Sequence, residues 1–229
     1  MKARTLKMLG ACLVVALAVS AVAVAQASAV EFIYKVNGAK LEAGAERELV
    51  SKAKTTQVLK ASPLGVSTEI VCTGLSTPGA KIKGGKPGTS TETVKYTGCK
   101  VNKPSGCKVA GEAITTNPLV NEIVEGVGAS AGKSLVLIKP ASGETFAEPK
   151  LEGFLCPSLA VKGSVLAEPL PQKSEVTAGT LKFEPAESKK YKNSAGAELA
   201  AGLTVAGKAS TVTGEVANEL GTKEKFGIF

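Results

Sequence analysis

Several residue types that catalytic and metal sites commonly use are missing from this chain. The sequence contains no histidine, aspartate or tryptophan, and aromatic residues make up 4% of it. Without histidine there can be no Ser-His-Asp or Cys-His arrangement and no imidazole ligand for a metal. Without tryptophan, only Tyr34, Tyr96 and Tyr191 add to the phenylalanines as stacking platforms for sugars. These absences argue against most catalytic functions and against a bound metal or cofactor.

Arginine is scarce as well, because Arg4 and Arg47 are the only two, and every acidic residue is a glutamate. Proteins that bind nucleic acids combine basic clusters with aromatic platforms. No window of this sequence supplies both, so we expect no nucleic-acid partner. Interspersed lysine and glutamate are typical of a plain soluble surface. On charge alone, the partners to expect are anionic cell-wall or membrane-surface components.

The long hydrophobic run of the chain lies at its start. Lys2, Arg4 and Lys7 precede an apolar stretch over 8–25, and Ala27-Ser28-Ala29 resembles an A-x-A cleavage site. We therefore predict a signal peptide at 1–29, a mature domain at 30–229, and a secreted or cell-envelope location. A retained membrane anchor is the alternative, because the run approaches the length of a membrane span. Cleavage would lower the net charge from +8 to +5.

The mature chain would keep an even number of cysteines, namely Cys72, Cys99, Cys107 and Cys156. In an exported protein this count indicates two disulfides. Zinc is a poor alternative, since no C-x-x-C pair is present. Turn-forming residues at 103–106 favour the pairing Cys99–Cys107, which leaves Cys72–Cys156. The other two connectivities stay open at this point.

The mature sequence has the pattern of short β-strands throughout. Asn37-Gly38 is a strong hairpin signal, and the glycines of two V-x-G-x-V segments, Gly163 and Gly214, indicate bulges or close backbone approach. Residues 45–54 are the best helix candidate but also suit a strand. The predicted strands are 32–36, 64–73, 89–97, 107–116, 119–125, 134–139, 145–153, 159–168, 176–184, 199–206, 210–216 and 225–229. This spacing predicts an all-β fold, an antiparallel sandwich or a barrel-like single domain.

Two short motifs suggest catalysis without completing it. Residues 128–132 match the G-x-S-x-G nucleophile elbow, but that elbow needs a histidine and a following helix. Ser130 and Lys133 also form an S-x-x-K pair, which could activate a serine if the lysine were desolvated. The companion motifs of such enzymes are missing. Pairs of glutamates could still support glycoside hydrolysis, although most glutamates alternate with apolar residues, as on a solvated strand face.

Several segments together resemble a family of secreted, uncharacterised all-β proteins of actinobacteria with a Gly-Cys/Cys pattern. The segments are Ile70-Val71-Cys72, Tyr96-Thr97-Gly98-Cys99-Lys100-Val101, Pro104-Ser105-Gly106-Cys107-Lys108-Val109, Ile114-Thr115-Thr116-Asn117-Pro118-Leu119, Ser142-Gly143-Glu144-Thr145-Phe146 and Val161-Lys162-Gly163-Ser164-Val165-Leu166. The resemblance implies an exported β-domain that keeps these cysteines. It implies no activity and no catalytic residues.

From the sequence we predict a non-catalytic protein, a secreted or envelope-associated binding or structural module, with no catalytic, cofactor or metal residues. One alternative is an extracellular hydrolase, which requires two glutamates, or Ser130 with a lysine, in one pocket. Another is a small-ligand carrier. A carrier requires a closed barrel around an apolar cavity on the order of a few hundred Å³.

Overall fold

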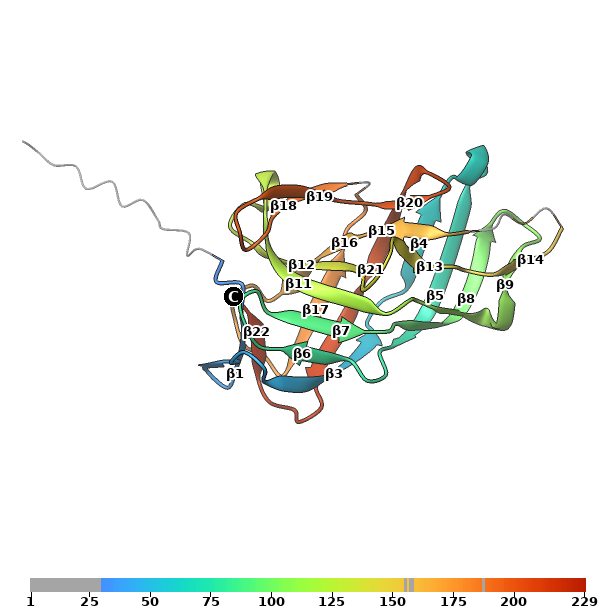
Figure 1. Cartoon of the computed structure of the whole chain (residues 1–229). Coiled ribbons are helices and arrows are strands. Elements are labelled where there is room, and N and C mark those ends of the chain that lie inside the picture. Colours follow the sequence, from blue (N-terminus) through green and yellow to red (C-terminus); the bar gives the residue numbers. More distant parts are fainter. Residues whose placement is uncertain (1–29, 155, 157–158, 187) are drawn as a thin grey trace, which may run out of the picture.

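The computed structural model describes residues 30–154, 156, 159–186 and 188–229. The predicted all-β class is confirmed, and of the two architectures left open the structure has a closed antiparallel barrel (Figure 1). The predicted signal peptide at 1–29 lies outside the described residues. Within the described ranges, no helix has the length and apolar character needed to cross a bilayer.

Short strands account for nearly all of the regular structure. The strands are β1 (Tyr34–Val36), β2 (Ala39–Lys40), β3 (Glu46–Ala53), β4 (Gln57–Ala61), β5 (Thr68–Ser76), β6 (Lys81–Lys83), β7 (Thr89–Glu92), β8 (Lys95–Lys103), β9 (Lys108–Val109), β10 (Ala113–Thr115), β11 (Leu119–Gly126), β12 (Ser134–Pro140), β13 (Thr145–Ala147), β14 (Leu151–Glu152), β15 (Val161–Gly163), β16 (Val165–Leu170), β17 (Ala178–Phe183), β18 (Lys189–Lys192), β19 (Glu198–Ala201), β20 (Leu203–Val205), β21 (Lys208–Leu220) and β22 (Phe226–Ile228). Three single 3-10 turns interrupt them, η1 (Pro63–Gly65), η2 (Ala110–Glu112) and η3 (Gly128–Ser130).

Hydrogen-bonded neighbours close the barrel around one circuit. β3 pairs with β21, and the ladder continues through β17, β16, β12, β11, β7 and β6 back to β3. A second circuit continues the same barrel toward its other end, from β21 through β4, β5, β8 and β10. An isolated bridge then joins Thr116 to Ala147, and β13, β15 and β20 lead back to β21. Closure satisfies the strand edges that an open sheet would expose.

The long strand β21 belongs to both circuits because it changes partners at a glycine, pairing with β20 and β4 before Gly214 and with β17 and β3 from Gly214 onward. Gly214 has a φ of +142°, and a Cβ there would lie 2.5 Å from Oε1 of Gln57 on β4. Gly163 likewise has a positive φ and lies against the backbone of Gly202. The predicted close backbone approach is therefore found at Gly163, whereas Gly214 lies against the side chain of Gln57.

The two ends of the barrel differ. At one end, β1 forms a small sheet with β2 and β22, and the predicted hairpin turn at Asn37-Gly38 is confirmed by the register Val36–Ala39. At the other end, β9 pairs with β14 outside the barrel circuit (Figure 1). The helix alternative for 45–54 is wrong, because β3 occupies this segment and pairs on both sides. Four strands, β2, β4, β6 and β18, were not among the predicted ranges.

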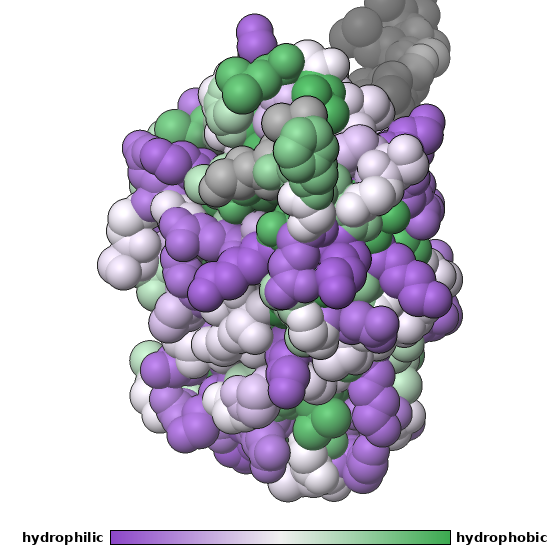
Figure 2. Space-filling model, turned by 90° about the vertical axis from the view of Figure 1, so that its right-hand side faces the viewer, coloured by the Kyte–Doolittle hydropathy of each residue, from purple (hydrophilic) through white to green (hydrophobic). Residues whose placement is uncertain are grey.

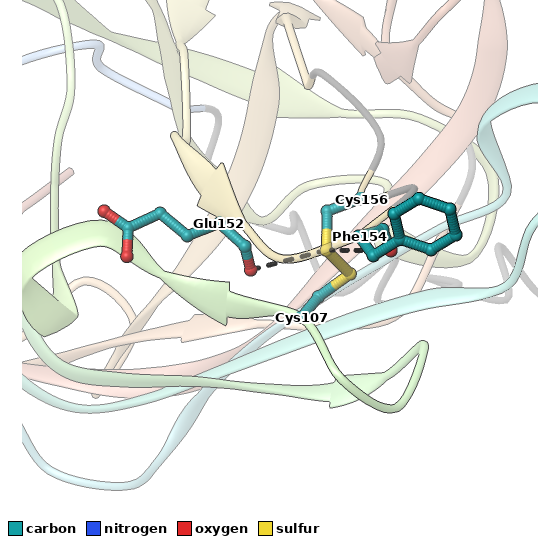
Figure 3. Close-up of a disulfide and its surroundings, with 4 residues drawn as sticks. All are labelled: Cys107, Glu152, Phe154 and Cys156. Atoms are coloured by element: carbon teal, nitrogen blue, oxygen red, sulfur yellow. Dashed lines mark hydrogen bonds between the residues drawn. A yellow bond between two sulfur atoms is a disulfide. The ribbon is translucent and has the colours of Figure 1, made fainter.

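The favoured disulfide pairing is also wrong. The structure joins Cys72 to Cys99 and Cys107 to Cys156. Cys72 on β5 stands directly opposite Cys99 on β8, with Cα atoms 4.0 Å apart. The turn after β8 sends Cys107 to β9, and the β9–β14 pairing brings it to Cys156 (Figure 3). Strand register therefore decides the pairing, and the turn at 103–106 does not.

Buried apolar residues form two separate clusters. The larger one lines the barrel interior and includes Ile70, Leu119 and Ile123. The smaller one lies outside the barrel, where the β18–β19 hairpin pairs with the end of β11 and covers its outer face. Its members are Val124, Leu135, Leu137, Leu166, Tyr191 and Ala201.

Candidate functional site: a cavity inside the barrel

The barrel interior is not completely filled. It holds a cavity of about 130 Å³, lined mainly by apolar side chains from strands on all sides. The lining runs from Tyr34 and Phe226 near one end of the barrel to Phe146 and Leu203 near the other. The cavity therefore follows the interior of the barrel and does not form a dent in its surface.

The volume bounds what could occupy this space. An engineered apolar cavity of about 150 Å³ stays dry and takes up benzene, so the barrel cavity has room for a molecule of roughly that size. It is smaller than the few hundred Å³ we expected of a carrier. The closed barrel and the apolar lining agree with that alternative, and the volume restricts it to small ligands.

Polar side chains gather on one wall of the cavity, where β7 pairs with β11. Ser90 stands opposite Asn121, and Glu92 stands opposite Leu119. Because side chains alternate between the two faces of a strand, these four residues all point inward. Asn121 Nδ2 donates hydrogen bonds to Ser90 Oγ at 2.9 Å and to Glu92 Oε1 at 2.8 Å.

Burial favours the neutral forms of the titratable groups on this wall. Burial raises the pKa of the Glu92 carboxyl, and the hydrogen bond from Asn121 opposes the rise. Burial also raises the pKa of the Tyr34 and Tyr96 hydroxyls, and the nearby Glu92 carboxylate would add to both shifts. All three groups therefore hold their protons more tightly than they would in water.

Some polar atoms of the wall have no partner. Asn121 Oδ1 is enclosed and accepts no hydrogen bond. Among the described residues, no hydrogen bond reaches Glu92 Oε2 or the Tyr96 hydroxyl, and no lysine or arginine forms an ion pair with Glu92. Buried polar groups in native proteins are normally satisfied by protein or by ordered water, so these atoms are available for hydrogen bonds to a molecule in the cavity.

Within the described residues, the cavity contains neither of the two arrangements that the hydrolase alternative requires. Lys133 forms an ion pair with Glu168 at 2.9 Å, which raises the pKa of the lysine and keeps it protonated. Ser130 lies in η3, away from the cavity lining. Among described residues that line the cavity, Glu92 is the only glutamate, so two carboxylates do not converge there.

On the outer surface of the described residues, charged side chains are mostly paired. Fourteen lysine or arginine ion pairs with glutamates disperse the positive charge over the described residues. Hydrophilic side chains dominate the face in Figure 2, with apolar ones gathered near its top. The most exposed large apolar residues are Leu64 and Phe154, and the latter lies beside the Cys107–Cys156 disulfide (Figure 3). Binding to anionic envelope components stays a prediction.

Comparisons with protein families, with curated proteins and with solved structures find no match to this chain. The resemblance to secreted actinobacterial proteins therefore also stays a prediction. Reasoning from the sequence missed the polar wall. A signal for it exists in Thr89-Ser90-Thr91-Glu92, where alternate polar residues share one face, but the sequence alone does not tell which face is the interior.

Proposed function

We propose that this protein binds a small, predominantly apolar molecule inside its barrel and acts outside the cytoplasm as a non-catalytic carrier or sequestering module. The observation that supports this most directly is the apolar cavity of about 130 Å³ in a closed barrel. Small barrels commonly hold one small ligand in this position. The two disulfides agree with an oxidising location.

The polar wall supports binding over a purely structural role. A barrel that served only as a scaffold would gain stability from a filled, apolar interior. Here the interior keeps open space next to Glu92 and Tyr96. Space and unsatisfied polar groups at one place are what a binding site requires, namely an apolar body and a few fixed polar contacts.

Toluene, a ligand of suitable size, tests the proposal. We expect it to bind the disulfide-intact protein with one saturable site, detected by NMR shifts of methyl groups in the cavity lining. Val165 lines the cavity and is half-buried, so Val165→Phe should fill the space and abolish the shifts. Val66, an exposed residue, provides the matched control, because Val66→Phe adds the same ring on the surface. Equal binding by the Val165→Phe variant, or no binding by the unaltered protein, would refute the proposal.

A further inference from the structure

Glu92 is the least expected group in the barrel interior. It is an acidic side chain in an apolar cavity, and no basic side chain among the described residues pairs with it. Transferring an unpaired carboxyl from water into such an environment is costly. Nothing in the pairing of β7 with β11 requires an acid at this position, since an apolar residue would fit the inward face.

The hydrogen-bonding capacity of the wall limits the chemistry of a ligand. A side-chain amide has two N–H donors, and those of Asn121 are both used, by Ser90 and Glu92. Asn121 Oδ1 accepts no hydrogen bond, and the hydroxyls of Ser90, Tyr34 and Tyr96 can each donate or accept. Among the described residues of this wall, the Glu92 carboxyl is therefore the group that can carry a negative charge toward a ligand.

We propose, on the basis of the function proposed above, that the natural ligand is an apolar amine whose protonated nitrogen pairs with the Glu92 carboxylate and whose apolar body fills the barrel. A protonated amine brings both donors and a positive charge, and an ion pair is strong in a low-dielectric interior. A carboxylate ligand would place a second acid beside Glu92. An alcohol would supply one donor and no charge.

Binding of such a ligand is coupled to the protonation of Glu92. Burial raises the pKa of this carboxyl, so at a pH where the carboxyl of the empty barrel is protonated, capture of an ammonium ion from solution forms the ion pair and releases that proton to the buffer. The other titratable groups of the lining are Tyr34 on β1 and Tyr96 on β8, and both stay neutral because burial raises their pKa values. The Cys72 sulfur is held in a disulfide. The released proton is therefore assigned to Glu92.

Four ligands that share one ring separate the possibilities, namely toluene, benzyl alcohol, benzylamine and benzoate. Their affinities are measured by calorimetry on the unaltered protein and on two variants. Glu92→Gln replaces the carboxyl with an amide of nearly the same shape that cannot ionise. Glu122→Gln is the matched control, because Glu122 lies on the paired strand and faces Lys139 on the outside.

We expect benzylamine to bind at least about tenfold more tightly than toluene and benzyl alcohol, and benzoate to bind most weakly. Glu92→Gln should remove the preference for the amine, and Glu122→Gln should keep it. Calorimetry in two buffers with different heats of ionisation should show proton release on benzylamine binding that decreases as the pH rises, and no release in the Glu92→Gln variant. Circular dichroism of both variants establishes that they are folded.

The outcomes distinguish this inference from the proposed function. If toluene binds and benzylamine binds no more tightly than benzyl alcohol, the cavity is a ligand site and the amine is wrong. A preference for benzylamine that survives Glu92→Gln would also overturn the inference. If none of the four ligands binds, both proposals fail together.

Discussion

The two faces of one strand, β12, belong to different kinds of core. Leu135 and Leu137 point outward into the small cluster beneath the β18–β19 hairpin. Val136 and Ile138 point inward and line the barrel cavity. All four residues are buried to a similar degree, with relative exposures between 2% and 4%. Equal burial therefore conceals a difference, because the inner pair borders the large cavity and the outer pair does not.

The outer cluster and the barrel interior therefore contribute differently to the stability of the fold. The outer cluster is small, apolar and covered by a hairpin that adds little else to the barrel. The interior is larger, but it accommodates Asn121, Ser90 and Glu92 and is not completely filled. Close packing is what a stable core requires. We interpret the outer cluster as a support and the interior as the place reserved for a ligand.

The largest effect should come from removing side-chain volume in the closely packed region. Leu137→Ala deletes a buried side chain among packed neighbours and should lower the free energy of unfolding by about 2–5 kcal/mol. Leu181→Ala removes the same atoms from a half-buried side chain that borders the cavity, and should cost about half as much or less. Denaturant unfolding monitored by circular dichroism measures both. Equal losses would show that the interior is packed as closely as the outer cluster.

The sequence predicted the class of the fold well and its fine register poorly. Alternation and turn residues identify strands such as 119–125 and the hairpin at Asn37-Gly38, because these signals are local. The disulfide pairing failed because it depends on β5 lying beside β8, with β6 and β7 inserted between them in the chain. No local pattern encodes which distant strands become neighbours.

The cavity wall could be recognised only in part. Ser90 and Glu92 share one face of a predicted strand, and Asn121 belongs to another, so each was visible as a polar residue at a regular position. An acid at such a position normally faces solvent, and Glu122 on the same strand as Asn121 does face a lysine outside. Barrel closure reverses the expectation for Glu92, and closure is a property of the whole chain.

A second pair of variants enlarges one valine in the outer cluster and one valine that lines the cavity. Val124→Phe enlarges a fully buried residue in the outer cluster and should destabilise the protein by about 1–3 kcal/mol, because the neighbours must move. Val165→Phe places the same ring in the cavity and should change stability by less than about 1 kcal/mol. Thermal unfolding by calorimetry would compare the two. A larger loss for Val165→Phe would mean that the open space cannot accept a ring, which would also weaken the proposal of a ring-sized ligand.

The smallest expected effect is on the pH dependence of stability. Glu92 in the interior and Glu184 outside the barrel should contribute to it with opposite signs. Burial raises the folded-state pKa of Glu92 above the ordinary value of 4.5. Between these two values the unfolded chain has lost the proton and the folded barrel has kept it, so stability falls as pH rises, by at most about 1.4 kcal/mol per pH unit. Glu184 lies outside the barrel, and Lys189 and Lys182 lower its pKa. Its contribution is therefore present above the ordinary value and is lost as pH falls.

Glu92→Gln should remove the decline in stability above the ordinary glutamate pKa, whereas Glu184→Gln should leave that decline in place and remove a small stabilisation at neutral pH. The Glu184 effect should stay below about 1 kcal/mol, because its ion pairs are partly exposed and screened by solvent. Urea unfolding across a pH series from about 4 to about 8 measures both slopes. If the unaltered protein and the Glu92→Gln variant gave parallel curves, the Glu92 carboxyl would be ionised in the folded barrel. It would then already have a counter-charge or access to water, and the open wall would not need a ligand to complete it.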